Sequence, residues 1–281
     1  AYYGAINAMR SVGARILEVA VQPDGMDLDV LETQLSRHRP KLIYTNPTFQ
    51  NPTGVTTSLA KRHAILALAR RFGAAILEDD HSPELRFAGE PVPPMRALAE
   101  PDDAVFYARG FGKVFLPGTR LGVVVVPERY RKVVLAAKAH SDLHCNGMLQ
   151  DALALYLRRK RYTDFLASMR RTYAARQRRL CDGLRAGLPE DTVVATPEGG
   201  LSLWLTLPEG SNVSELYFQA VRLGVAFVAG EVFYAARPDP RTLRLSFGHT
   251  PPELLEEGMS RLCSVINDLA RPRSASPMVV I

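Results

Sequence analysis

No apolar run in this sequence approaches the roughly twenty residues needed to span a bilayer, although 47% of its 281 residues are hydrophobic. We also expect no secretory leader, because Ala1-Tyr2-Tyr3-Gly4 offers neither a basic start nor an apolar run. Cysteine is scarce, since Cys145, Cys181 and Cys263 are odd in number and follow no disulfide pattern. We therefore expect a soluble, cytoplasmic protein with a sizeable core and no contact with membranes.

Internal repeats are absent as well, and we expect no metal site. Positive charge is in modest excess, with a net charge of +6. The basic residues, such as Arg158-Arg159-Lys160-Arg161 and Arg178-Arg179, are spread through helical segments rather than gathered in one binding motif. A solvated helix face is the simpler interpretation, and a surface for nucleic acid or another domain is the alternative.

Apolar runs of strand length alternate with amphipathic helical stretches through the first half of the chain. Helices are predicted over 28–37 and after Ser58, which has the side chain of an N-cap. The predicted strands are 14–21, 41–45, 74–77 and two runs that open near Val105 and Leu121. This alternation predicts an α/β fold with a mostly parallel sheet and helices on both faces.

The second half changes character twice. It is helical from about Asn146 to Leu188, and short strands and helices follow Pro197-Glu198-Gly199-Gly200. The expected strands are 201–205, 225–228 and 243–247, and the expected helices are 213–223 and 251–269. We expect a large domain over 1–145, then interdomain helices and a smaller α+β domain over 146–281, with a frayed tail from 271.

Three polar residues, Asn51, Asp79 and Lys113, come just after strand candidates. Ligands of such sheets bind beyond the carboxyl ends of the strands, so these side chains could converge on one site. Lys113 sits in a glycine-rich turn within Val105–Val126, between two apolar strands. A buried lysine is costly unless it is paired, neutralised or covalently used. With a depressed pKa it would be a nucleophilic amine, and a surface or salt-bridged lysine is the alternative.

Other candidates have simpler alternatives beside them. The turn Asn51-Pro52-Thr53-Gly54 has an amide that can hold a ligand oxygen, or it is purely structural. Asp79 and Asp80 can bind a metal, cap a helix or hold a cationic nitrogen. Arg120 and Arg244 can each clamp a phosphate or a carboxylate, although alternation along its strand makes a solvent-facing Arg244 the alternative.

Taken in order, these motifs resemble the fold-type I pyridoxal-phosphate enzymes. The similarity is to the aminotransferase-like class that includes aminoadipate and kynurenine aminotransferases and the carboxy-terminal domains of MocR-type (GntR family) regulators. It covers essentially the whole chain. The matching segments are 1–4, 51–54, 78–80, 113, 120–122, 198–201, 226–230 and 243–247.

The resemblance implies a role for each residue around the cofactor, pyridoxal 5'-phosphate. Lys113 would form the aldimine with the cofactor aldehyde and shuttle the substrate α-proton. Asp79 would keep the pyridinium nitrogen protonated. Asn51 would hydrogen-bond the ring hydroxyl oxygen.

Four further residues receive roles from the same resemblance. Tyr2 would pack at the cofactor, and Arg120 would clamp its phosphate. His81 stands where the family usually has a tyrosine that supports the ring oxygen, and it could still donate a hydrogen bond. Arg244 would bind the α-carboxylate of an amino acid substrate.

The sequence departs from the family pattern in two other ways. Gly110 and Gly112 occupy positions where the family usually has hydroxyl side chains that hold the phosphate. The upstream segment with the phosphate loop at a helix amino terminus has no counterpart, and we expect a portion of the protein to precede Ala1. Phosphate affinity should be weak in this chain alone unless that portion or a partner subunit completes the site.

The resemblance implies a pyridoxal-phosphate-dependent aminotransferase that moves an amino group between an α-amino acid and a 2-oxo acid. The alternative is the effector-sensing domain of a MocR-type regulator, which would reach DNA only through a preceding amino-terminal domain. A third possibility is a scaffold that has kept the fold and lost the cofactor. The resemblance also implies a homodimer.

Overall fold

The computed structural model describes residues 1–270, so the expected tail from 271 lies outside the described residues. The chain forms two compact units. Unit 1 holds residue 1, 15–172 and 197–200, and unit 2 holds 2–14, 173–196 and the chain from 201. The boundary expected at 145/146 lies inside unit 1, and the main division falls within helix α7 (Lys160–Gly187). Contacts such as the ring pair Phe115–Tyr156 tie helix α6 (Gly147–Leu157) to unit 1.

The main sheet of unit 1 has the strand order β3-β4-β5-β6. Its strands are β3 (Leu42–Thr45), β4 (Ala75–Asp79), β5 (Val105–Gly110) and β6 (Gly122–Val125). The pairs β3–β4 and β4–β5 are parallel, whereas β5–β6 is antiparallel. The predicted α/β class and mostly parallel sheet are confirmed, as is the strand, turn and strand of 105–126.

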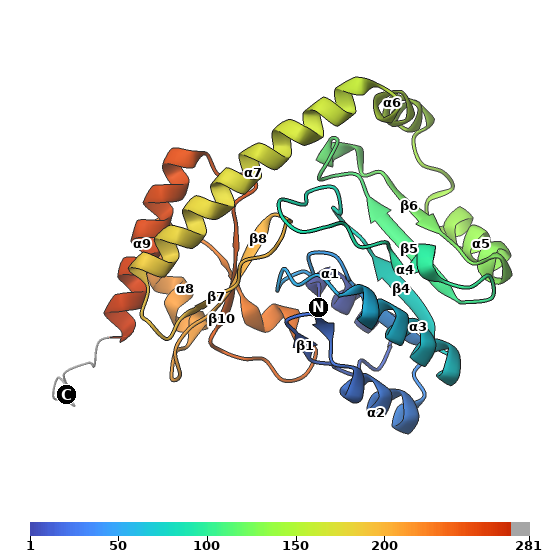
Figure 1. Ribbon diagram of the computed structural model, residues 1–281, viewed down its shortest axis with the longest axis horizontal. Coiled ribbons are helices and arrows are strands. Elements are labelled where there is room, and N and C mark those ends of the chain that lie inside the picture. The colour runs from blue at the N-terminus through green and yellow to red at the C-terminus, as the bar shows by residue number, and fades with distance from the viewer. Residues whose placement is uncertain (271–281) are drawn as a thin grey trace. The chain divides into compact units, whose positions relative to one another are not determined.

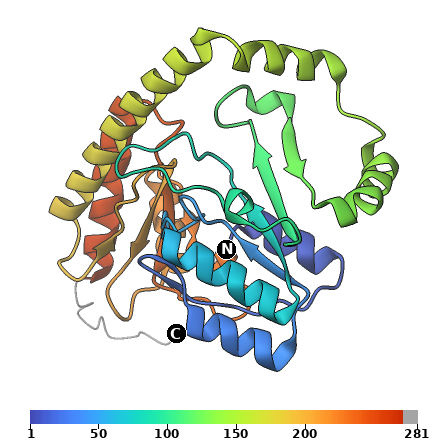
Figure 2. The same cartoon turned by 45° about the vertical axis from the view of Figure 1, so that its right-hand side comes forward.

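Helices α2 (Leu28–His38), α3 (Leu59–Phe72) and α4 (Met95–Leu98) build a core against one face of this sheet (Figures 1 and 2). Ile43, Ile76 and Val105 are register neighbours on that face and lie in the same apolar cluster. Period-2 alternation places Tyr44 and Asp79 on the opposite face, where both are half-buried. One face of the sheet is therefore packed by helices, and the other carries a polar pair.

Local signals explain where several elements begin and end. The Ser58 hydroxyl caps α3 by accepting a hydrogen bond from the Lys61 amide, and Gly73 ends the helix in the left-handed conformation with φ 69°. The predicted strand over 14–21 is wrong. That stretch leads only into the two-residue strands β1 (Val21–Gln22) and β2 (Gly25–Met26), which pair with each other. An apolar run without a neighbouring strand has no ladder to join.

Unit 2 is the smaller α+β unit that the sequence predicts. Its sheet has the order β7-β8-β10-β9, with antiparallel pairing throughout. The strands are β7 (Val193–Val194), β8 (Ser202–Thr206), β9 (Val228–Ala229) and β10 (Thr242–Ser246). The helices and short 3-10 turn are α1 (Tyr3–Ser11), α8 (Val213–Arg222), η3 (Gly230–Phe233) and α9 (Pro252–Ala270).

The sequence reading did not predict α4, β7, α1 or α5 (Arg131–Asp142). Helix α5 follows the 3-10 turn η2 (Glu128–Tyr130), and another 3-10 turn, η1 (Pro117–Thr119), precedes β6. The carboxy-terminal half of α7 runs beside α9, and Arg179 forms an ion pair with Glu256 at 3.0 Å (Figures 1 and 2). Within residues 1–270, none of the helices has the length and hydrophobicity of a membrane span.

Candidate functional site

The carboxyl ends of β3, β4 and β5 meet at one edge of the unit 1 sheet, because these three strands are parallel. The chain leaving β3 leads to Asn51, β4 ends at Asp79, and the turn after β5 carries Lys113. The topology thus brings three of the predicted site residues to the same edge, as expected from their positions after strands.

Asn46 ties two of these segments together. Its side-chain oxygen accepts a hydrogen bond from the Asn51 amide at 2.6 Å, and its side-chain nitrogen donates to the carbonyl of Asp79. Asn46 is 4% exposed, so this link is shielded from water. The peptide bond between Asn51 and Pro52 is cis. Sequence reasoning passed over Asn46, and the only signal for it was a second Asn-Pro pair five residues before Asn51-Pro52.

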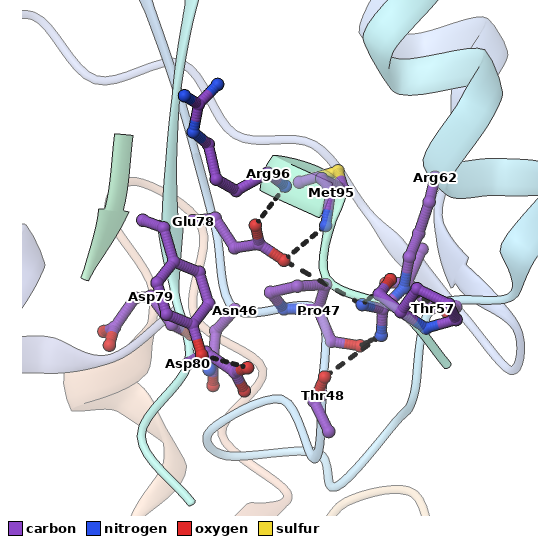
Figure 3. Close-up of polar contacts among 12 residues, drawn as sticks. Asn46, Pro47, Thr48, Thr57, Arg62, Glu78, Asp79, Asp80, Met95 and Arg96 are labelled. Carbon is purple, nitrogen blue, oxygen red and sulfur yellow. Dashed lines mark hydrogen bonds and ion pairs between the residues drawn. The ribbon is translucent and has the colours of Figure 1, made fainter. Parts of the chain in front are cut away.

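The adjacent acids Asp79 and Asp80 point to opposite faces of the sheet and have different surroundings (Figure 3). Asp79 is half-buried and accepts a hydrogen bond from the Tyr44 hydroxyl at 2.7 Å. Asp80 is 2% exposed and accepts a hydrogen bond from the Tyr107 hydroxyl at 3.0 Å. Burial raises the pKa of Asp80. Asp79 therefore lies on the face opposite helices α2, α3 and α4, and Asp80 lies on the face that they pack.

Lys113 is exposed, which contradicts the expectation that its neighbouring strands bury it. The turn after β5 directs Phe111 and Val114 into the interior and leaves Lys113 on the outside. Its amine is therefore accessible to a ligand in this chain. Arg120 is also exposed and has a left-handed backbone with φ 53°.

His81 continues the segment that leaves β4. It is half-buried, and its Nδ1 is in hydrogen-bond contact with the Ser82 hydroxyl. This contact engages one of the two ring nitrogens. His81 stands at the position where the family pattern has a tyrosine.

Arg244 and Tyr2 belong to unit 2. Arg244 lies in β10 opposite Trp204 of β8 and is half-buried, so the solvent-facing alternative is wrong. Its guanidinium lies 5.0 Å from the centre of the Phe233 ring, and Tyr3 packs on the same ring at 5.8 Å. Burial lowers the pKa of Arg244, and the nearby phenols of Tyr3 and Tyr2 oppose that shift. An arginine that stacks on an aromatic ring in this way has a restricted orientation.

Residues 1–270 contain no group of three or more histidine, cysteine or acidic side chains placed to hold a metal ion. His140 and His144 are four residues apart in sequence. They do not share a helix face, because α5 ends at Asp142 and Leu143 has a φ of 56°.

Comparison with known proteins gives the family. Residues 1–262 match the family model for aminotransferase class I and II. The chain is 36% identical over 271 residues to 2-aminoadipate transaminase of Thermus thermophilus, covering 95% of this chain and 68% of that protein. It is 28% identical over 263 residues to the probable rhizopine catabolism regulatory protein MocR of Rhizobium meliloti, covering 94% and 52%.

A solved structure agrees with these relatives. The crystal structure of alpha-aminoadipate aminotransferase from Thermus thermophilus, complexed with N-(5'-phosphopyridoxyl)-L-leucine, superposes with a TM-score of 0.88 at 35% identity. The match covers 96% of this chain and 70% of that chain. The chain spans about two thirds of the length of the curated aminotransferases that it matches. On the family match, the shared fold and the order of its motifs, this chain belongs to the class I and II aminotransferases.

Proposed function

We propose that this chain is part of a pyridoxal-phosphate-dependent aminotransferase, which moves an amino group between an α-amino acid and a 2-oxo acid. The observation that carries the proposal is the sheet edge where Asn46 joins the Asn51 turn to the end of β4 at Asp79, with the accessible amine of Lys113 in the next loop. Family membership supports it, as does the phosphopyridoxyl ligand of the Thermus structure.

The donor groups at this edge suit the functional groups of pyridoxal phosphate. An amine, Lys113, suits the aldehyde, and a carboxylate, Asp79, suits the protonated ring nitrogen. The amide of Asn51 suits the ring oxygen, and the guanidinium of Arg120 suits the phosphate. When bound, the cofactor supplies a ring that withdraws electrons from the substrate α-carbon. In this proposal, unit 1 is the cofactor-binding unit.

The protein's own side chains would do the remaining work. Lys113 would also accept and return the proton at the substrate α-carbon. Arg244 would bind the substrate α-carboxylate, and its half-buried setting strengthens that attraction because less water screens it. Tyr2 and His81 would contribute at the cofactor, as the resemblance implies. We also propose that the protein is a cytoplasmic homodimer.

The second candidate is an effector-sensing domain of a MocR-type regulator. The match to MocR over 94% of this chain favours it, since the same residues serve binding and catalysis. The two functions differ in turnover. An aminotransferase converts amino donor and 2-oxo acceptor repeatedly, whereas a sensor binds an amine or amino acid and passes the change to a DNA-binding domain.

The test is covalent labelling of the full-length protein. It is incubated with pyridoxal phosphate, reduced with borohydride and digested, and the labelled peptide is identified by mass spectrometry. We expect the label on Lys113 and its loss in Lys113→Ala. Lys138→Ala is the matched control, because Lys138 is also an exposed lysine and is paired with Asp142 at 2.8 Å. Full labelling of Lys113→Ala at a different lysine would overturn the proposal.

A further inference from the structure

Arg62 lies in the first turn of α3, and its side chain is fully buried, at 0% exposure. A guanidinium cannot lose its proton in a protein, so its charge is buried with it. The contacts of Arg62 must therefore offset the free-energy cost of burying its charge. Its hydrogen bonds go to the carbonyls of Thr57, Pro93 and Pro47 and to the hydroxyl of Thr48, each at 3.0 Å (Figure 3).

Three of these acceptors belong to one loop. Pro47 and Thr48 begin the segment that carries Asn51, and Thr57 ends it. The Thr57 amide also donates to the Pro47 carbonyl at 2.7 Å, which closes the loop at its base. The guanidinium of Arg62 thus holds both ends of residues 47–57. Asn46, directly before Pro47, then links Asn51 of this loop to Asp79 through the hydrogen bonds of its side chain.

The same guanidinium reaches the strand that ends at Asp79. Its Nη1 lies 3.9 Å from Oε1 of Glu78, and both side chains are completely buried. The Glu78 carboxylate accepts hydrogen bonds from the amides of Met95 at 2.8 Å and Arg96 at 2.9 Å (Figure 3). Glu78 immediately precedes Asp79, so Arg62 contacts the segments that carry two of the proposed cofactor ligands.

We propose that Arg62 is a positioning residue, which holds the loop 47–57 against β4 and so fixes Asn51 relative to Asp79. The part of this inference that concerns cofactor binding rests on the proposed function. A lysine could not replace it, because one ammonium group on a flexible chain cannot serve four acceptors from two loops at once. The arrangement uses the fixed fork of the guanidinium rather than its charge alone.

A competing explanation is that Arg62 only neutralises Glu78. The double variant Arg62→Met/Glu78→Gln separates the two. It removes the charges of Arg62 and Glu78, keeps side chains of similar size, and leaves a side-chain carbonyl at position 78 that can still accept a hydrogen bond from the Met95 or Arg96 amide. The third buried acid near Arg62, Asp80, is unchanged in this variant and is a hydrogen-bond acceptor of the Tyr107 hydroxyl. If neutralising Glu78 is the whole role of Arg62, the hydrogen exchange of loop 47–57 and the cofactor affinity of this variant match those of the wild type. If Arg62 holds the loop, the variant folds and the loop is still released.

The first measurement is hydrogen exchange on the full-length protein without cofactor. The amides of Gln50 and Gly54 donate to the Val55 and Gln50 carbonyls and report on the loop. We expect their exchange to be at least about tenfold faster in Arg62→Lys and in the double variant, as for loss of one charge-assisted hydrogen bond or more. Arg70→Lys is the control on the same helix, because Arg70 pairs with Asp103 and not with the loop. Its loop exchange should match the wild type.

The second measurement is a titration with pyridoxal phosphate. Both Arg62 variants should bind it about tenfold more weakly, and the pH midpoint of the bound cofactor's absorbance change should rise. The rise is expected because a displaced Asn51 amide no longer stabilises negative charge on the ring oxygen. A general loss of stability would lower occupancy without moving that midpoint.

The two proposals fail separately. Loop exchange and cofactor affinity within twofold of the wild type in Arg62→Lys or in the double variant would overturn the role of Arg62. A wild type that binds no pyridoxal phosphate at Lys113 would overturn the proposed function and the role of Arg62 at the cofactor, while loop exchange would still decide whether Arg62 holds 47–57.

Discussion

The hydroxyl of Tyr44 donates a hydrogen bond to Oδ2 of Asp79 at 2.7 Å, from β3 to the neighbouring strand β4. On the other face of the same strand, the hydroxyl of Tyr107 makes the equivalent bond to Oδ2 of Asp80 at 3.0 Å. The two acids therefore have matching donors on opposite faces, and only the Tyr44 bond belongs to the face proposed for the cofactor. This symmetry supplies an internal control.

Tyr44→Phe should weaken pyridoxal phosphate binding about tenfold, because a hydrogen bond to a charged group contributes about 1.5 kcal/mol or more. The bond orients the Asp79 carboxylate toward the ring nitrogen in the proposed site. Titration followed by absorbance measures the effect. Tyr107→Phe removes the same kind of bond from Asp80 and should leave the affinity within about twofold. Equal weakening by the two variants would show that the effect is a loss of general stability.

Asp80→Asn tests the electrostatics of the packed face. Burial raises the pKa of Asp80, with the Tyr107 hydrogen bond and the charge of Arg62 acting against the shift. A raised pKa in the folded protein means that the carboxyl's contribution to stability is present below the unfolded value, about 3.9, and is lost as pH rises through the folded value. An asparagine at position 80 cannot ionise, so the variant does not lose this stability. Its free energy of unfolding relative to that of the wild type should therefore increase as the pH rises above about 4. Urea unfolding from pH 4 to pH 7 measures it.

Asp103→Asn gives the opposite sign and serves as the comparison. The hydrogen bond from Arg70 lowers the pKa of Asp103, so its contribution is present above the unfolded value and is lost as pH falls through the folded value. Its variant should lose stability relative to the wild type as the pH rises from about 2 to about 5. The same slope for both variants would contradict the assignment of Asp80.

The features that the sequence predicted correctly are set by residues close together in the chain or by consecutive strands. Ser58 caps α3 through a bond three residues away, and Asn51 and Asp79 come to one sheet edge because consecutive parallel strands share the direction of their ends. The exposure of Lys113 was mispredicted, because flanking apolar strands do not reveal which way a turn residue points. Arg62 was missed since its acceptors lie up to 31 residues away and carry no pattern of their own.

Gly199 lies at a close approach of three chain segments, for which the sequence analysis gave no reason. A Cβ on this residue would collide with the Leu85 carbonyl and the ring of Phe49, which is 3% exposed and lies two residues before Asn51. Gly199→Ala should therefore lower the free energy of unfolding by about 1–3 kcal/mol. Gly258→Ala is the control, because a Cβ there meets nothing within 4 Å and α9 gains a better helix former. It should raise stability by about 0.5–1 kcal/mol, and a loss in both variants would mean that steric contact is not the cause in Gly199→Ala.

Arg244→Ala should separate substrate binding from cofactor binding. The half-buried guanidinium on the Phe233 ring is proposed to bind the substrate α-carboxylate, and losing such a charge-assisted contact costs about 1.5–3 kcal/mol, or about ten- to hundredfold in amino acid affinity. Pyridoxal phosphate affinity should stay within about twofold. Arg241→Ala is the matched control in unit 2, since Arg241 is engaged by Asp239 at 2.9 Å and should affect neither ligand. Amino acid binding is measured by the absorbance change of the loaded protein, and cofactor binding by direct titration. If Arg244→Ala weakens both ligands equally, the residue contributes to the unit as a whole and the carboxylate role is wrong.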